Sequence, residues 1–305
     1  MSSTAIVVGA GVLGRLLALR LAEEGWRVTL LDRDDERGTR SCTWTGAGML
    51  SPYCEREAAE RLITDLGILS MDRWPEILRG LAAPVFYREM GSLVVAHPHD
   101  RDELERLRRR VLERAVRADQ MRDVRGDELR ELEPELGDRF ASGLYFPLER
   151  HLDNRELLHA LGLTLAQRGV TCLYQTEATR LAPRAVATAQ GDLQADWVFD
   201  CRGLGAERDL PDLRGVRGEI LYIEAPDVHL NRPVRMMHPR YSIYIVPRAA
   251  QRYLVGATMI ESNDLGPITV RSSLELLSAA YSVCPGFAEA RLLETSVNCR
   301  PGFPD

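Results

Sequence analysis

The chain has 305 residues, of which 45% are hydrophobic and 28% charged, and its formal net charge is −6. This length is enough for about two domains with a substantial core, and the acidic balance disfavours nucleic acid and anionic membranes as partners. No apolar run approaches the ~20 residues that span a bilayer, and no secretory signal opens the chain, so we expect a cytoplasmic protein.

The N-terminal segment has the pattern of a dinucleotide-binding βαβ unit. An apolar run at residues 5–8 leads into a glycine-rich turn, a helical pattern and a second apolar run. In this motif Gly9 permits the tight turn, Gly11 lets the backbone approach a pyrophosphate, and Gly14 lets the helix pack closely on the strand. Asp32 follows the second run, where a carboxylate accepts hydrogen bonds from ribose hydroxyls. The pattern predicts a dinucleotide cofactor but leaves NAD and FAD open.

The next part of the chain does not continue as a simple βα repeat. Residues 41–50 are mostly small, which allows a backbone segment to lie against a flat ring. A helix is predicted from about 55 to 79, followed by two strands at 85–88 and 91–96. The charged stretch 100–133 has leucines and valines at helical spacing, which predicts solvated helices with one buried stripe.

Apolar runs then resume in an order that predicts a return to the nucleotide-binding sheet. The predicted elements are a strand at 144–147, a helix capped by Asn154 and ending near 167, and strands at 170–174 and 195–200. A second glycine-bearing turn, 201–205, follows the last of these strands. Ligands of open α/β sheets bind at this end of the strands.

The C-terminal third is richer in strand patterns. β-rich runs at 219–223, 242–246 and 253–257 are separated by Pro and Gly turns, as in an antiparallel domain. A helix at 270–281 and a last strand near 292–297 complete the predicted elements.

Neither the cysteines nor the histidines form a metal or disulfide pattern. The six cysteines show no CxxC spacing, which in a reducing compartment predicts free thiols. The six histidines are scattered, apart from His97 and His99 beside a proline in a predicted loop. We therefore expect no metal site.

Four segments carry a resemblance to a known family: 7–14, 46–52, 244–248 with 255–259, and 300–305. They resemble the FAD-dependent amino acid oxidases of the D-amino acid oxidase type and, within them, the glycine oxidases of thiamine biosynthesis. The resemblance implies an α/β fold in which a Rossmann-like FAD-binding domain is interleaved with an α+β, largely antiparallel substrate domain.

The same resemblance implies the domain boundaries. They are 1–84 and 144–214 for the FAD-binding domain, 85–143 and 215–299 for the substrate domain, and 300–305 for the start of a C-terminal FAD-domain segment. Family members continue with a further strand and helix. The resemblance therefore implies that this chain is C-terminally truncated and holds FAD less firmly, because a terminus without tertiary support frays.

The resemblance also implies a set of cofactor contacts. The implied FAD-binding residues are Gly9, Gly11, Val12, Leu13, Gly14, Asp32, Arg33, Cys42, Thr43, Ala47, Gly48, Met49 and Ala178. Residues 47–49 would face the isoalloxazine ring, and Val12 and Leu13 would approach the cofactor through their backbone. Asp32 and Arg33 would hold the adenosine ribose, with Cys42 and Thr43 along the diphosphate and ribityl chain. Ala178 would touch the adenine through its main chain, at a position where the family usually has valine.

Two residues are implied to bind the substrate. Arg300 corresponds to the arginine that binds the substrate carboxylate, and Tyr244 to an aromatic side chain beside the substrate. A guanidinium fork matches a carboxylate in geometry and charge. Without the resemblance, Arg300 would be interpreted as a surface arginine, and Tyr244 equally fits a residue packed on one face of a strand. We assign no catalytic acid or base, because hydride transfer to a flavin depends mainly on positioning.

The implied reaction is FAD-dependent oxidation of glycine, or of another small amine or D-amino acid, to an imine or 2-oxo acid, with reduction of O2 to H2O2. It would serve thiamine thiazole biosynthesis, with thiazole synthase downstream, and a homo-oligomer is compatible with it. The alternatives are a D-amino acid dehydrogenase or sarcosine-type oxidase, an inactive truncated flavoprotein, and an NAD-dependent dehydrogenase indicated by the glycine motif alone.

Overall fold

A computed structural model describes residues 2–57, 59–113, 120–240 and 243–304 of the chain. The helices are α1 (Val12–Glu23), α2 (Cys42–Thr45), α3 (Arg61–Arg79), α4 (Arg101–Glu113), α5 (Gly126–Leu132), α6 (Asn154–Gln167) and α7 (Val270–Val283). The strands are β1 (Thr4–Val8), β2 (Arg27–Leu31), β3 (Met49–Leu50), β4 (Tyr87–Arg88), β5 (Ser92–Ala96), β6 (Arg122–Arg125), β7 (Ser142–Phe146), β8 (Arg150–Leu152), β9 (Thr171–Leu173), β10 (Ala178–Ala182), β11 (Ala185–Thr188), β12 (Gly191–Gln194), β13 (Trp197–Asp200), β14 (Arg214–Glu224), β15 (Val234–Met237), β16 (Ile243–Pro247), β17 (Arg252–Gly256), β18 (Ile260–Glu261) and β19 (Arg291–Gly302).

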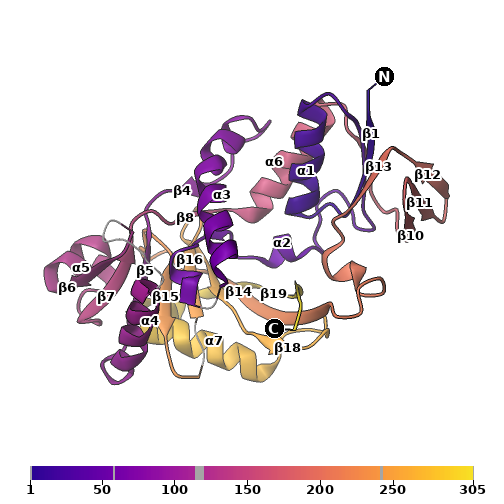
Figure 1. Cartoon of the computed structure of the whole chain (residues 1–305). Helices are drawn as coiled ribbons and strands as arrows, with labels where there is room; N and C mark the ends of the chain where they lie inside the picture. Colours follow the sequence, from indigo (N-terminus) through magenta and orange to yellow (C-terminus); the bar gives the residue numbers. More distant parts are fainter. Residues whose placement is uncertain (1, 58, 114–119, 241–242, 305) are drawn as a thin grey trace.

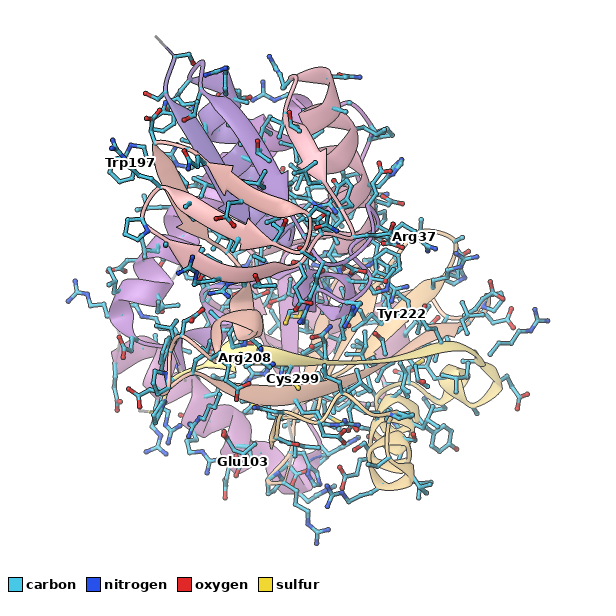
Figure 2. All side chains as sticks on the ribbon, turned by 90° about the vertical axis from the view of Figure 1, so that its right-hand side faces the viewer. Arg37, Glu103, Trp197, Arg208, Tyr222 and Cys299 are labelled. Carbon is cyan, nitrogen blue, oxygen red and sulfur yellow. The ribbon has the colours of Figure 1, made fainter. Side chains whose placement is uncertain are left out.

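The molecule consists of two halves that meet near the short helix α2 (Figure 1). One half holds β1, β2, α1 and α6, and the other is a large sheet with α4 and α7 beside it. Tyr222 lies between the two halves, whereas Trp197 and Glu103 lie toward their outer sides (Figure 2). The predicted mixed α/β fold with a largely antiparallel second part is confirmed.

A parallel four-stranded sheet forms the first half, in the order β13-β1-β2-β9. The β-branched run Ile6-Val7-Val8 is almost fully buried, as expected for a strand that is covered on both faces. Helices α1 and α6 pack against each other beside this sheet, and their leucines share one core cluster with β1 and β2. Helix α1 begins at the carboxyl ends of the strands, which is where nucleotides bind in such sheets.

A nine-stranded sheet forms the second half, in the order β18-β14-β17-β16-β15-β5-β7-β6, with β19 also paired to β14. Its pairs are antiparallel except for β15 with β5. Helix α7 packs against β14, β16 and β17, and buries the apolar residues Leu276, Ala279, Ala280 and Val283. The other face of these strands is turned toward α2 and β3.

Two small three-stranded sheets complete the fold. One, β10-β11-β12, lies at the outer end of the parallel sheet, and the other has the order β3-β8-β4. In the latter, Met49 of β3 pairs with His151 of β8. This pairing places the small-residue segment 41–50 at the junction of the two halves.

Several predicted elements need correction. The strand 144–147 was expected in the nucleotide-binding sheet, but β7 pairs with β5 and β6 in the nine-stranded sheet. The long helix begins at Arg61 rather than near 55, because a separate 3-10 turn occupies Cys54–Glu57. Helix α6 is capped by Asp153, not Asn154: the Asp153 carboxylate accepts hydrogen bonds from the backbone N–H groups of the first turn.

The last strand is also longer than expected. β19 continues to Gly302 and pairs with β14 along almost its whole length, so residues 300–302 lie in the nine-stranded sheet. The charged stretch contains two helices, α4 and α5, with strand β6 before the second. Residues 114–119 of that stretch, Ser242 of the predicted strand 242–246 and Asp305 of the last motif lie outside the described residues.

All six cysteines are free thiols. Among the described residues, no group of three or more His, Cys, Asp or Glu side chains could hold a metal ion. In the same part of the chain, no helix combines the length and apolarity that a membrane crossing requires.

A buried carboxyl group holds the turn that precedes α3. Glu149 is fully buried, and its Oε1 accepts hydrogen bonds from the backbone N–H groups of Tyr53 (3.0 Å) and Cys54 (2.7 Å). The Ser92 hydroxyl donates to Oε2. Burial raises the pKa of Glu149 to about 7, although these hydrogen bonds oppose the rise.

Stability should therefore fall as pH rises across this range. An unfolded glutamate loses its proton near pH 4.3 whereas folded Glu149 keeps it until about pH 7, so the unfolding free energy declines between these values. Glu149→Gln keeps an acceptor for both N–H groups and removes the titration. We expect urea unfolding at pH 5 to 8 to show a variant that gains about 3 kcal/mol over the wild type as pH rises. If the unfolding free energies of the two proteins changed equally with pH, the raised pKa of Glu149 would be contradicted.

Candidate active site

The glycine-rich turn between β1 and α1 is shaped by close backbone contacts. Gly9 has a φ of +108°, and a Cβ added there would lie 2.3 Å from the carbonyl oxygen of Cys201. A Cβ on Gly14 would lie 1.8 Å from the carbonyl oxygen of Gly9. Gly11 differs, because its nearest neighbour would be Thr43 Oγ1 at 3.6 Å. The first and third glycines are thus needed for packing, and the second leaves space beside the loop.

The start of α1 has the features of an anion site. Gly11 is the N-cap and provides no side-chain hydrogen bond, and the first turn contains no acidic residue. The Val12 N–H donates to Thr43 Oγ1 at 3.0 Å, and Leu13 is 67% exposed at the helix start. N–H groups at a helix start attract phosphate. The open side of Gly11 and this helix start, where the N-cap residue has no side chain, fit a dinucleotide, so the residues present suit FAD.

Asp32 lies directly beside the glycine turn. Its carboxylate accepts hydrogen bonds from the backbone N–H groups of Ala10 and of Asp34, the latter at 2.7 Å. A carboxylate has about four acceptor positions, so capacity for ribose hydroxyls is left. The Asp32 carbonyl accepts from the Thr176 N–H at 2.8 Å, and Arg33 lies 3.9 Å from Glu177. The segment that leads to Ala178 is therefore beside Asp32, as the cofactor prediction requires.

The small-residue segment passes from the glycine turn to the large sheet. The Cys42 thiol donates to the carbonyl oxygen of Cys299 at 2.7 Å, and burial followed by the neighbouring Cys299 raises the pKa of Cys42. Thr45 Oγ1 and Ser296 Oγ are 2.9 Å apart. Ala47 and Met49 pack with Ile220, Tyr222, Tyr244, Val246, Leu254 and Ala257 in one apolar cluster. The predicted flavin-facing residues thus lie on the sheet face that carries Tyr244.

Arg300 reaches Tyr244 by crossing a neighbouring strand. Its Cα is paired with Val216, and its guanidinium lies over Gly218, where an added Cβ would be 2.9 Å from both Nη atoms. Arg300 Nη1 donates to the Thr258 carbonyl at 3.4 Å. Burial raises the pKa of Tyr244, and the charge and a hydrogen bond of Arg300 oppose this rise. The structure therefore brings the two predicted substrate residues together.

No carboxylate neutralises Arg300 within the described residues. Its contacts there are a backbone carbonyl and a phenol, both uncharged when Tyr244 is protonated. The guanidinium fork is therefore able to accept a carboxylate ligand, and Tyr244 is able to donate a further hydrogen bond beside it.

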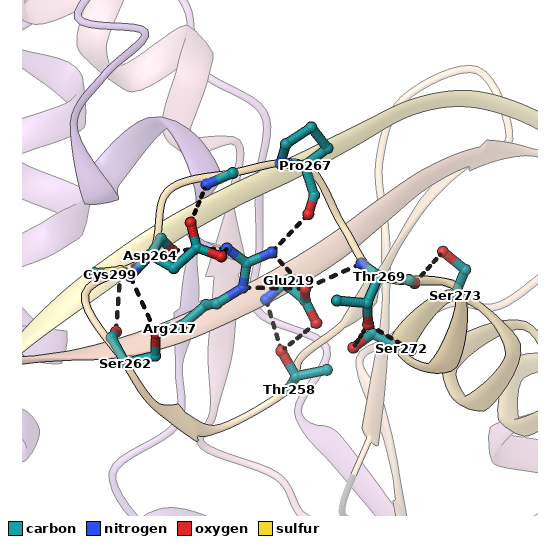
Figure 3. A network of polar contacts seen from close by, with 11 residues as sticks. Arg217, Glu219, Thr258, Ser262, Asp264, Pro267, Thr269, Ser272, Ser273 and Cys299 are labelled. Carbon is teal, nitrogen blue, oxygen red and sulfur yellow. Dashed lines mark hydrogen bonds and ion pairs between the residues drawn. The ribbon is translucent and has the colours of Figure 1, made fainter.

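A polar network on the opposite face of β14 fixes the position of Thr258 (Figure 3). Buried Arg217 donates to Glu219 Oε1 at 2.7 Å and to Asp264 Oδ2 at 2.9 Å. The Thr258 hydroxyl donates to Glu219 Oε2 at 3.1 Å. Burial tends to raise the pKa of Glu219, but hydrogen bonds from Ser272, Arg217 and Thr258 lower it below its usual value. The ionised Glu219 thereby holds Thr258, whose carbonyl contacts Arg300.

Gly218 provides a direct test of this geometry. In Gly218→Ala the new Cβ displaces the Arg300 guanidinium, and such a displacement should lower kcat/KM for a small amino acid by roughly 10- to 100-fold. The affinity for FAD should not change. Gly302→Ala is a matched control on β19, because its Cβ would lie 3.5 Å from Val216, an ordinary contact. Equal kinetics in the two variants would argue against this position for Arg300.

Sequence reasoning missed Arg155, which joins the two halves. This arginine, at the second position of α6, is stacked between Trp44 (4.4 Å to the ring centre) and Tyr222 (4.1 Å). It also makes a bidentate ion pair with Glu294 of β19, at 2.7 and 2.9 Å. An arginine in the first turn of a helix looks like a solvated side chain in a sequence, so no local signal indicated this contact.

Arg248 was also missed. It lies in the 244–248 segment that carried the family resemblance, but no role was assigned to it there. The structure buries it beside Ala47 and Asn154.

The fold and the site together define an FAD-dependent enzyme. The family model of the FAD-dependent oxidoreductases (DAO) matches residues 4–305, so the chain belongs to this family and uses FAD. A Rhizobium etli protein provisionally named thiamine biosynthesis oxidoreductase ThiO is 43% identical over 300 residues, covering 98% of this chain and 84% of that protein.

Two further proteins that resemble this chain, one in sequence and one in fold, are named glycine oxidases. The glycine oxidase of Pseudomonas aeruginosa is 27% identical over 331 residues, covering 100% of this chain and 84% of that enzyme. The crystal structure of glycine oxidase from Bacillus cereus has a TM-score of 0.85 with 22% identity, covering 99% and 84% of the two chains. The latter likeness concerns the fold.

Proposed function

We propose that this enzyme oxidises glycine, or a closely related small amine or D-amino acid, to the imine, with O2 reduced to H2O2. The amine loses two electrons and two protons and O2 gains them, so the reaction balances. The observation that carries the proposal is the Arg300 guanidinium, which has no carboxylate partner among the described residues and lies beside Tyr244, on the sheet face that packs Ala47 and Met49. The R. etli and P. aeruginosa relatives support the same reaction class by their names.

In this mechanism the protein binds and orients the substrate. Arg300 holds the carboxylate through paired N–H groups, and the protonated Tyr244 phenol donates beside it, because burial raises the Tyr244 pKa. FAD, when bound, supplies the acceptor for the hydride from the substrate Cα. The amine reacts in its neutral form, so no side chain has to remove a proton during the transfer. Positioning of the Cα–H is then the main contribution of the chain.

We further propose the cofactor contacts given by the family resemblance, together with its domain boundaries, except that residues 144–146 and 300–302 belong to the nine-stranded sheet. The proposed FAD-binding residues are Gly9, Gly11, Val12, Leu13, Gly14, Asp32, Arg33, Cys42, Thr43, Ala47, Gly48, Met49 and Ala178. Support comes from their convergence along one path, from the start of α1 through Asp32 and Thr43 to the cluster that contains Met49.

The metabolic role follows from the substrate proposal. An imine of glycine hydrolyses in water, so an enzyme that uses the imine itself has to capture it before hydrolysis. We propose that this capturing enzyme is the thiazole synthase of thiamine biosynthesis, in agreement with the name of the R. etli relative.

The experiment is steady-state turnover of the FAD-loaded protein with glycine, sarcosine and D-alanine. Oxygen consumption and peroxide formation are measured in the same samples. Equal amounts of oxygen consumed and peroxide formed with glycine would support the proposal. Turnover only with an added dye acceptor would make the enzyme a dehydrogenase, and no turnover with any of the three amines would refute the substrate class.

A further inference from the structure

Arg248, directly after β16, is a buried cation whose guanidinium is directed at the small-residue segment. Its side chain is almost fully enclosed. Nη2 donates to the Ala47 carbonyl at 2.6 Å and to Asn154 Oδ1 at 3.2 Å. The only carboxylate paired with it among the described residues is that of Asp153, whose Oδ2 lies 3.4 Å from Nε.

Asp153 neutralises this cation only in part. The other oxygen of Asp153, Oδ1, accepts the capping hydrogen bonds of α6 from the N–H groups of Arg155 (2.8 Å) and Glu156 (3.1 Å). The negative charge of Asp153 is therefore divided between the start of α6 and Arg248. Burial lowers the pKa of Arg248, and Asp153 is the first group that opposes the change. The position therefore keeps a positive charge in an apolar setting at an energetic cost, which suggests a function for the charge.

A buried imidazole near Arg248 is unsatisfied. Among the described residues, neither ring nitrogen of fully buried His151 has a hydrogen-bond partner. Burial, followed by the charges of Arg248 and Arg88, lowers the pKa of His151 to about 3, so this ring is neutral. His151 thus adds no positive charge beside Arg248.

The contacts of Arg248 fix the backbone at the centre of the segment. Gly48 has a φ of +61°, and an added Cβ would lie 2.1 Å from the Leu152 carbonyl and 3.4 Å from Arg248 Nη2. Asn154, which accepts from Arg248, donates to the carbonyls of Thr43 and Trp44. Arg248 therefore holds the segment at Ala47, and Asn154 holds it at Thr43 and Trp44.

We propose that Arg248 is a positioning residue for the flavin ring: it holds Ala47–Gly48–Met49 in place through the Ala47 carbonyl, and its buried charge favours electron uptake by the ring. The inference rests on the proposed function, which places these three residues beside the isoalloxazine. A cation near the ring stabilises the negative charge that reduction brings.

The test compares Arg248→Met and Arg248→Lys with Arg232→Met. Arg232 is an equally buried arginine that binds the backbone carbonyls of Met90 and Leu132 and pairs with Glu133, away from the segment. The control therefore reports what the loss of a buried arginine does to stability alone. Four quantities are measured: the melting temperature without FAD, the FAD dissociation constant, the midpoint potential of bound flavin, and kcat and KM with glycine.

For Arg248→Met we expect at least tenfold weaker FAD binding, a potential lowered by about 30 mV, equivalent to tenfold in a two-electron equilibrium, and a lower kcat with unchanged KM. Arg248→Lys should restore the potential more than the FAD affinity, because it keeps the charge but not the fork. Cofactor properties that match those of Arg232→Met would overturn the inference. Failure of the wild type to bind FAD or to be reduced by amines would instead refute the proposed function.

Discussion

Arg300→Met should lower kcat/KM for glycine by about 10- to 150-fold, because one charge-assisted hydrogen-bonded contact with the carboxylate contributes about 1.5–3 kcal/mol. The loss should appear mainly as a higher KM, since the carboxylate is held in the ground state as well as in the transition state. FAD content and melting temperature should stay at wild-type values, because Arg300 is exposed, forms no ion pair among the described residues and contacts the Thr258 carbonyl only at 3.4 Å. The kcat/KM of Arg300→Lys should lie between the values of Arg300→Met and the wild type.

The matched control for this variant is Arg214→Met. Arg214 lies on the neighbouring strand β14 and pairs with Glu261 in an exposed ion pair, so its loss should leave the kinetics unchanged. Stopped-flow reduction over a range of glycine concentrations gives the apparent substrate affinity directly. Wild-type affinity in Arg300→Met would show that the carboxylate is bound elsewhere.

Two alanine substitutions in the glycine turn should separate folding from cofactor binding. In Gly14→Ala the new Cβ would lie 1.8 Å from the Gly9 carbonyl oxygen, so α1 must move away from β1 and the protein should lose several kcal/mol of stability. In Gly11→Ala the Cβ has room, and the φ of −68° suits alanine. Gly11→Ala should therefore melt like the wild type without FAD but bind FAD at least tenfold more weakly, since its methyl group occupies the open side of the loop.

Thermal melting of the FAD-free proteins and FAD titration by fluorescence measure the two effects independently. Gly25→Ala is not a suitable control because Gly25 has a φ of +83°. Gly80, the C-cap residue of α3, has a φ of −83° and room for a methyl group, so Gly80→Ala suits this purpose. Full FAD affinity in a folded Gly11→Ala protein would show that the pyrophosphate does not approach this turn.

The glycine motif allowed the nucleotide half to be predicted because its signals are local. Residues 5–14 combine strand, turn and helix in one stretch, and β1, β2, β9 and β13 pair in parallel as such a motif requires. The strand 144–147 was placed in the wrong sheet, because an apolar run shows that a strand is buried but not which sheet it joins. Its partners β5 and β6 are set by pairing over long sequence distances.

The candidate site residues rest on the family resemblance rather than on local pattern, and they stay a prediction. The structure brings Arg300 to Tyr244, but the reason is tertiary: Gly218 has no side chain that would block the guanidinium. Arg155 and Arg248 were missed for a related reason, since neither burial nor stacking of an arginine leaves a mark on its sequence neighbours. Once the register of two paired strands is known, a glycine on one strand beside an arginine on the other indicates room for the guanidinium.

The central claim is that a small amino acid held by Arg300 reduces FAD bound along the path from Gly11 to Met49. Anaerobic mixing of the FAD-loaded protein with glycine tests it most directly, with the visible flavin absorbance as the readout. The account predicts that the oxidised flavin band bleaches in the wild type and that bleaching at low glycine concentration is lost in Arg300→Met. A flavin that binds to the protein yet stays oxidised with glycine, sarcosine and D-alanine would contradict it.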